Sequence, residues 1–119
     1  MDQTHTYRIA LKQVLEQYAQ HHPTPNNGAI RTDLICDPER DCYALMSVGW
    51  NEHRRIFAPI FYAMLRHGQI ILEHDGLGYG ISADLVAAGV APTDIIWAWE
   101  QSDPPVSYAT YLSEQAVIV

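Results

Sequence analysis

Histidines are the side chains of this sequence best suited to acid–base or metal chemistry, and there are six of them. His67 and His74 flank one short apolar run, and Glu73 and Asp75 bracket His74. Because successive side chains of a strand point to opposite faces, Glu73 and Asp75 would share one face and His74 would lie on the other. His67, His74, Asp75 and the glycine-rich loop after them define one hypothesis, a small-molecule or metal-binding enzyme, which we rank last.

The loop at residues 75–80, Asp-Gly-Leu-Gly-Tyr-Gly, has the glycine spacing of a phosphate-binding loop between a strand and a helix. It lacks the Gly-x-x-x-x-Gly-Lys-Ser/Thr pattern, and no Lys or Arg lies near it to meet phosphate charge. The chain also contains no His-Glu-x-x-His, Cys-x-x-Cys or Gly-x-Ser-x-Gly motif. We therefore predict no catalytic residue, no cofactor and no metal ligand.

Cys36 and Cys42 are the two cysteines, and they flank a predicted hairpin turn, where they could lie close together. The N-terminus has no apolar core typical of a signal peptide, so we expect reduced thiols in a cytoplasmic protein. A metal site would need two more ligands, and the acidic turn supplies no soft donors. No apolar run approaches the ~18 residues of a membrane span, so no membrane association is expected.

The chain is acidic, with fourteen Asp and Glu against seven Lys and Arg and a formal net charge of −7. A protein that binds duplex DNA by itself needs a basic face to neutralise phosphates. This composition favours a protein or small-molecule partner, with DNA contacted only indirectly. Arg54 and Arg55 form a basic dipeptide that could contact phosphate or the carboxylates of a partner.

The length of 119 residues predicts one domain, residues 1–119, large enough to bury a core without disulfides or metal. Residues 3–21 are expected to form a helix that Asp2 or Thr4 caps and Pro23 ends. Five apolar positions recur at helical spacing and should face the core: Tyr7, Leu11, Val14, Leu15 and Tyr18.

The centre of the fold is predicted to be an antiparallel meander within residues 43–75, with a further strand at residues 29–36 before it. In the strand at residues 42–50, Gly49 leaves a gap that indicates close packing by a neighbour. The next strand, residues 54–65, also has helical spacing, but its aromatic and β-branched content favours a strand. Pro59 places that strand at an edge or at a bulge, because proline has no N–H to donate.

The remaining segments are predicted to cover or extend this meander. Ser82 is expected to cap a short helix over residues 83–88, and Gly89 to end it. A last strand is expected at residues 95–99. The tail from residue 106 ends in Ala-Val-Ile-Val and is a candidate docking segment for a partner, or a strand added to a sheet.

The ordered set of these segments resembles the XisI-like family, the fdxN element excision controlling factors of cyanobacteria. The resemblance covers about residues 7–96 and is carried by the following stretches: Tyr7-Arg8, Tyr18-Ala19, Tyr43-Ala44-Leu45-Met46-Ser47-Val48-Gly49-Trp50, Arg54-Arg55-Ile56, His67-Gly68-Gln69-Ile70, Glu73-His74-Asp75-Gly76, Leu85-Val86-Ala87-Ala88-Gly89-Val90 and Asp94-Ile95-Ile96. The sequence departs from the family pattern at Phe57, Tyr62 and Met64, at Leu77-Gly78, and at Pro105-Val106-Ser107-Tyr108.

The resemblance implies an α+β domain built on an antiparallel sheet, with an N-terminal helix and a short second helix. It also implies a cytoplasmic accessory factor that acts with a companion, an XisH-like protein, in programmed excision of a DNA element. Our first hypothesis is therefore a non-enzymatic protein–protein module, with partner-binding candidates Trp50, Arg54, Arg55 and Tyr108. The aromatic strands and Pro59 also suggest a homodimer. The second hypothesis is a direct DNA-binding excision factor, which requires Arg31, Arg54 and Arg55 to lie near one another.

Overall fold

The computed structural model describes residues 3–21, 29–78 and 80–117 of the chain. The elements follow in this order: α1 (Gln3–His21), β1 (Ile30–Asp37), β2 (Cys42–Asn51), β3 (Arg54–Arg66), β4 (Gln69–Asp75), α2 (Gly80–Ala87), the 3-10 helix η2 (Pro92–Asp94), β5 (Ile95–Trp97) and α3 (Tyr108–Val117). Asp2, one of the two predicted caps of the first helix, and Pro23, its predicted end, lie outside the described residues. Thr4, the other predicted cap, lies inside α1 and not before it.

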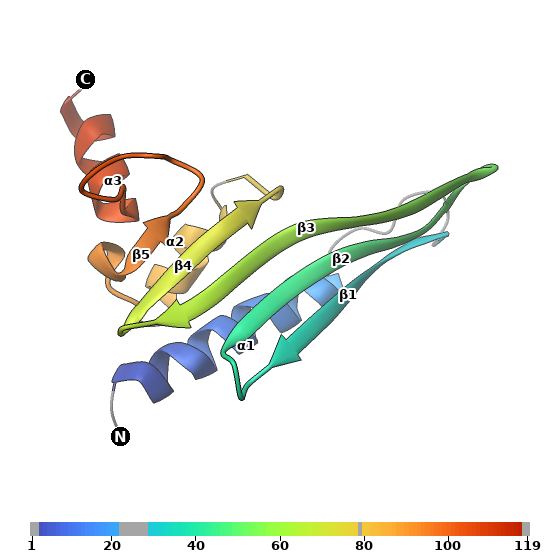
Figure 1. The fold of residues 1–119 in the computed structure, drawn as a ribbon, viewed down its shortest axis with the longest axis horizontal. Helices are drawn as coiled ribbons and strands as arrows, with labels where there is room; N and C mark the ends of the chain where they lie inside the picture. The colour runs from blue at the N-terminus through green and yellow to red at the C-terminus, as the bar shows by residue number, and fades with distance from the viewer. Residues whose placement is uncertain (1–2, 22–28, 79, 118–119) are drawn as a thin grey trace.

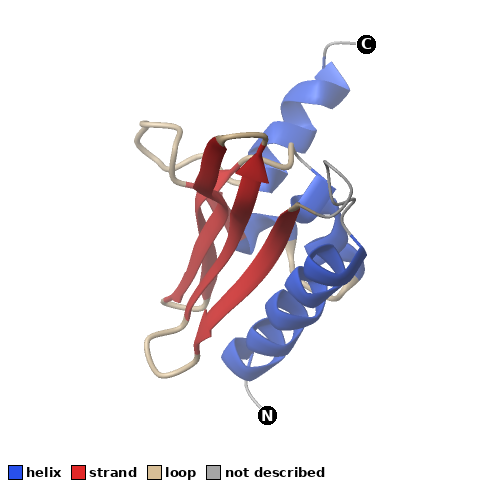
Figure 2. Cartoon of the chain, turned by 90° about the vertical axis from the view of Figure 1, so that its right-hand side faces the viewer, coloured by secondary structure: helices blue, strands red, loops and turns tan. Residues whose placement is uncertain are grey.

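The sheet has five strands in the order β1-β2-β3-β4-β5. The first four pair antiparallel, as the meander prediction required, and β5 joins β4 in parallel. Figure 2 shows the helices gathered on one side of the sheet, which leaves the opposite face without a covering layer. The α+β prediction is confirmed.

The core lies between α1 and the covered face of the sheet. Four of the five residues predicted for the apolar helix face are buried, and Tyr18 packs against the core while partly exposed. Opposite them, alternate residues of the central strands supply the sheet side of the core: Tyr43, Leu45, Phe61, Ala63, Leu65, Ile70 and Leu72.

Pro59 occupies a position that is both at an edge and next to a bulge, as its chemistry predicted. Leu45 pairs with Phe61 whereas Met46 pairs with Pro59, so Ile60 is an extra residue in β3. β4 pairs with β3 only from Phe61 onward, so Pro59 lies beyond the end of that neighbour. The absent N–H of proline therefore costs no ladder hydrogen bond there.

The second helix begins earlier than predicted, and Ser82 is not its cap. α2 starts at Gly80, which places Ser82 inside the helix with its side chain fully buried. There the Ser82 hydroxyl accepts a hydrogen bond from the indole N–H of Trp97 at 3.2 Å. Gly89 ends the helix as expected: with φ of 107°, it lets the N–H of Val90 reach the carbonyl of Leu85.

The C-terminal segments also differ from the prediction. β5 ends at Trp97, because the chain turns there and Trp99 stacks back on Trp97 with ring centroids 5.3 Å apart. The tail forms a helix, α3, and not a strand, although Ser107 makes one antiparallel bridge to Ile96 just before it. Within the described residues, no helix is both long and apolar enough to cross a membrane.

Candidate interaction surface

The β2–β3 hairpin projects past the end of β4, and we call its outer part, residues 46–59, the arm; β1 pairs with the β2 side of the arm as far as Gly49. Figure 1 shows it as a long ribbon that continues beyond the end of β4. The exposure of β3 reflects this position: in its second half, Phe61, Ala63 and Leu65 are buried, whereas most of the first half is exposed on both faces. The β3 side of the arm is thus a part of the sheet that the described body of the molecule leaves mostly exposed.

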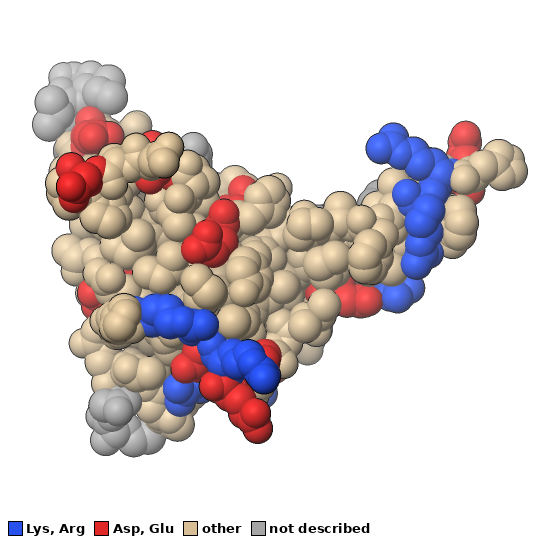
Figure 3. Space-filling view, viewed as in Figure 1, with Lys and Arg blue, Asp and Glu red and all other residues tan. Residues whose placement is uncertain are grey.

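The uncovered side of the sheet, which we call the open face, is largely apolar. Strand pairing places on it the following apolar residues, which alternate with the core residues: Ile35, Ala44, Met46, Val48, Trp50, Phe57, Tyr62, Met64, Ile71 and Ile96. Arg31, Asp33 and Arg55 lie on the same face, and Val48 is 5% exposed among its neighbours. Among them Phe57 is 69% exposed, Ile35 54% and Trp50 50%. Figure 3 looks onto this face and shows mostly uncharged atoms across the sheet. Contiguous apolar surface of this kind is typical of an interaction site.

Trp50 and Arg55, two of the predicted partner-binding residues, lie together on the arm. They are directly opposite in the strand register, and the guanidinium carbon of Arg55 lies 5.2 Å from the Trp50 ring centroid. Arg55 also donates a hydrogen bond to the carbonyl of Gly49 at 3.3 Å. This cation–π contact holds the Trp50 ring and the Arg55 guanidinium together on the open face. Tryptophan and arginine are both enriched at binding hot spots.

The three arginines of the DNA-binding hypothesis all lie in the outer part of the first three strands. Arg31 lies opposite Val48 on the open face and is paired with Asp33 at 3.0 Å, whereas Arg54 points to the other face. Figure 3 shows basic side chains gathered at that end of the molecule. The structure therefore groups these arginines at one end but divides them between two faces.

Tyr108 does not lie with the other predicted partner-binding residues. Its side chain is 9% exposed and belongs to an aromatic cluster with Trp97 and Tyr111 in the body. Tyr108 therefore anchors the start of α3, and we do not include it in the candidate surface. The roles of Trp50, Arg54 and Arg55 stay predictions.

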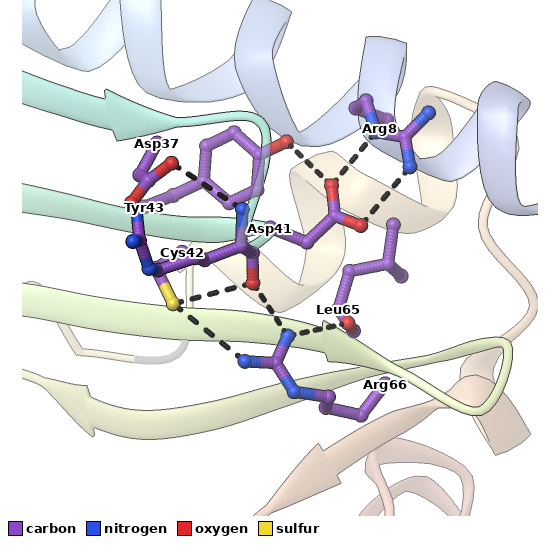
Figure 4. Close-up of polar contacts among 8 residues, drawn as sticks. Arg8, Asp37, Asp41, Cys42, Tyr43, Leu65 and Arg66 are labelled. Carbon is purple, nitrogen blue, oxygen red and sulfur yellow. Dashed lines mark hydrogen bonds and ion pairs between the residues drawn. The ribbon is translucent and has the colours of Figure 1, made fainter.

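A polar cluster ties α1 to the base of the hairpins (Figure 4). Arg8 donates to both carboxylate oxygens of Asp41, at 2.7 and 3.0 Å, and the Tyr43 hydroxyl donates to the same group. The Arg8 contact lowers the pKa of the Asp41 carboxyl, and burial raises the pKa of Tyr43 to about 12. Arg66 donates to the carbonyls of Arg40 and Leu65. Each ion and carbonyl in this cluster has a partner within the fold, which indicates a structural role.

The enzyme hypothesis finds little support in the arrangement of its residues. A cavity of about 280 Å³ is lined by His74, Asp75, Gly78 and Trp99, but His67 lies in a different hollow beside Arg66. Within the described part of the chain, no three His, Cys, Asp or Glu side chains converge as metal ligands would. Cys36 pairs with Tyr43 and Cys42 with Asp37, so the two thiols point to opposite faces of the hairpin.

Asp75 is the carboxylate that lines this cavity, and its two oxygens have different surroundings. Its Oδ1 accepts the N–H of Leu77 at 2.9 Å, whereas its Oδ2 is buried without a hydrogen-bond partner among the described residues. Burial raises the pKa of the Asp75 carboxyl above its ordinary value.

Comparison with known proteins identifies the family. The family model described as XisI protein matches residues 1–110. The chain belongs to the XisI family. One solved relative is the fdxN element excision controlling factor XisI from Anabaena variabilis, 25% identical, with a TM-score of 0.73 over 87% of this chain and 93% of that chain. Another is a XisI-like protein from the same organism, 25% identical, with a TM-score of 0.76 over 86% of this chain and 92% of that chain.

No curated protein matches the sequence, so the family assignment rests on the family model and the solved structures. The family resemblance read from the ordered segments is confirmed. The residue patterns did not show which face of β2 and of the start of β3 the helices would leave exposed. Both faces of these strands carry apolar residues, and alternation alone does not say which face a helix covers.

Proposed function

We propose that this protein is a non-enzymatic controlling factor in the excision of a DNA element, and that it acts by binding a companion protein through the open face of the arm. The observation that carries the proposal is the exposed pair of Trp50 and Arg55 on an apolar surface that no described helix covers. The solved relative is described as an excision controlling factor, which supports a regulatory role. The resemblance to the family suggests an XisH-like protein as the companion.

The physical case for a protein partner rests on the cost of leaving this surface in water. Burial of apolar surface contributes about 25 cal/mol for each Å², and the exposed rings of Phe57 and Trp50 would supply much of that area. Arg55 adds a cation that is already held in place by Trp50, so less side-chain entropy is lost on binding.

The test is a calorimetric titration of the purified protein with an XisH-like protein. We expect a stoichiometric complex, and we expect Trp50→Ala and Arg55→Ala each to weaken it at least about tenfold, as hot-spot truncations do. Leu112→Ala is the matched control, because Leu112 is an exposed apolar residue on α3, away from the arm. Equal weakening by the control, or no complex at all, would contradict the proposal.

Direct contact with DNA is a second candidate, favoured by the basic side chains at the end of the arm. Each phosphate neutralised should contribute about −0.9 to the slope of log affinity against log salt. With Arg31 paired to Asp33 and Arg54 on the other face, we expect no binding to duplex DNA at physiological salt. A steep salt-dependent isotherm that Arg54→Ala weakens would instead support this second function.

A further inference from the structure

The first half of β3 has a free edge. β2 pairs with it on one side, but β4 begins its pairing at Phe61, and no described strand pairs with residues 54–59 on the other side. The last backbone contact on that side is the N–H of Gly76, which donates to the carbonyl of Ile60 at 2.6 Å. A row of unpaired backbone groups at a sheet edge is a template for another strand.

The alternation of antiparallel pairing shows which groups are free. The N–H of Trp50 donates to Ala29 beside β1, so the backbone groups of Gly49 and Asn51 point toward β3. Their partners, Ile56 and Arg54, therefore point back toward β2. It follows that both backbone groups of Arg55 and of Phe57 point outward along the free edge.

The free edge is bounded symmetrically about Ile56. The hairpin turn ends at His53 on one side, and Pro59, with the bulge at Ile60, interrupts the edge on the other. Both limits are equally far from Ile56 in the sequence. A strand added to this edge must therefore be short, with one end near His53 and the other near Pro59. The same segment of a second copy, running antiparallel, has this length.

We propose that this edge pairs with the same edge of a second copy of the chain, antiparallel and centred on Ile56. In that register Arg55 of one copy lies opposite Phe57 of the other, and the outward backbone groups of both residues are satisfied. The Arg55 guanidinium then lies beside its own Trp50 and the exposed Phe57 of the second copy, so cation meets aromatic and no arginine directly faces an arginine. This contact uses the edge of the arm, not its open face, and goes beyond the proposed function.

The distribution of charge fits this arrangement. No acidic residue lies between Arg54 and Arg66, whereas the chain after Arg66 has no Lys or Arg and seven acidic residues: Glu73, Asp75, Asp84, Asp94, Glu100, Asp103 and Glu114. In the paired register, the arm of each copy runs toward the end of β4 of the other, where the acidic part of the chain begins. The two arginines of the arm outnumber its one acidic residue, Glu52, so the arm of one copy and the acidic body of the other attract each other across the contact.

The terminal strands, β5 and β1, are poorer candidates. The segment before α3 already occupies the edge of β5, where the N–H of Trp97 donates to the carbonyl of Val106 and Ser107 bridges Ile96. α1 packs against β1, and Figure 2 shows the helix flanking that side of the sheet. A second copy approaching β1 would meet this helix, whereas nothing described flanks the edge at Arg55 and Phe57. The free edge of β3 is thus the one that a second sheet can reach.

The experiment is disulfide trapping by engineered cysteines, in a background that carries Cys36→Ala and Cys42→Ala. Ile56→Cys should form a covalent dimer under mild oxidation, because directly opposed residues of a non-hydrogen-bonded antiparallel pair have Cα atoms about 4.5 Å apart. Phe57→Cys tests the register and Thr32→Cys tests the β1 edge. We expect the Ile56→Cys variant to cross-link at least about tenfold faster than either, since only its Cα separation suits a disulfide.

Sedimentation equilibrium of the unmodified chain provides the second measurement, and should give twice the 13.4 kDa mass at tens of micromolar protein. Circular dichroism of each cysteine variant identifies any that fails to fold, and the unmodified chain keeps the proposal testable in that case. A monomeric mass would overturn the proposal. So would faster cross-linking through Thr32→Cys, which indicates pairing at β1, or through Phe57→Cys, which indicates packing of two open faces.

Discussion

The two halves of β3 each contain one phenylalanine but lie in opposite environments. From Phe61 to Leu65, alternate side chains are buried against α1, and β4 pairs along the outer edge. From Arg54 to Pro59, no strand among the described residues pairs on that edge, and Phe57 is 69% exposed. The bulge at Ile60 separates the two halves. One strand therefore contributes core at one end and interaction surface at the other.

The two phenylalanines of β3 show that residue type alone does not decide whether a side chain is buried or exposed; the neighbouring elements do. Phe57 and Phe61 are the two phenylalanines of the chain, in the same strand, four residues apart. The bulge adds a residue between them, so Phe61 faces α1 whereas Phe57 faces the open side.

The largest expected effect on stability comes from replacing each phenylalanine with alanine in a separate variant. Phe61→Ala should lower the free energy of unfolding by about 3–5 kcal/mol, because it leaves a cavity in the core. Phe57→Ala should change it by less than about 0.5 kcal/mol, because its ring is already in water. Urea denaturation of both variants measures the difference, and comparable losses would show that the arm packs as tightly as the body.

A smaller effect is expected where the arm joins β1. A Cβ at Gly49 would lie 2.0 Å from the carbonyl oxygen of Ala29, a backbone atom that cannot rotate away. We expect Gly49→Ala to cost about 2–4 kcal/mol in the same denaturation assay, by overpacking and strain.

Gly68→Ala is the matched control for that variant. Gly68 has a φ of +74° with open space around it, so only backbone strain of about 1 kcal/mol is expected. If both variants lose the same stability, the close approach of Ala29 does not hold the base of the arm.

The smallest effect concerns Asp75, opposite Phe61 where the body half of β3 begins. Burial raises the pKa of Asp75, so the folded state binds its proton more tightly and stability falls as pH rises through that pKa. Asp75→Asn should therefore stabilise the protein at pH 7, by less than about 1 kcal/mol because the site is partly solvated, and should lose this gain below about pH 4.

Glu73→Gln, a change at the exposed neighbour, is the control and should shift stability little at either pH. Destabilisation by Asp75→Asn at pH 7 would mean that the charged carboxylate has a stabilising partner.

Much of the fold could be predicted from local signals. The spacing of Tyr7, Leu11 and Leu15 predicted the helix and its buried face, and the aromatic and β-branched content of residues 54–65 predicted a strand. Pro59 predicted an interruption of β3, since a missing donor restricts where a strand can pair. Gly49 predicted close packing, which the carbonyl of Ala29 provides.

The misplaced elements depended on contacts between distant segments. Ser82 has the chemistry of a cap, but burial beside Trp97 gives its hydroxyl a different partner. The apolar tail was compatible with a strand, and packing of Tyr108 and Tyr111 on Trp97 stabilises a helix there instead. The same limit applied to the partner-binding candidates. The sequence could not show that Tyr108 would be buried and Trp50 exposed.

The interruption at Pro59 and Ile60 has a consequence for solubility. Cross-β fibrils grow by stacking uninterrupted, proline-free strands of six or seven residues, edge upon edge. Beyond the turn, β3 presents only residues 54–58 before a proline and a bulge break its edge, and the edge of β1 is flanked by α1. A chain that keeps Trp50 and Phe57 exposed thus has, in one proline, a local safeguard against amyloid growth.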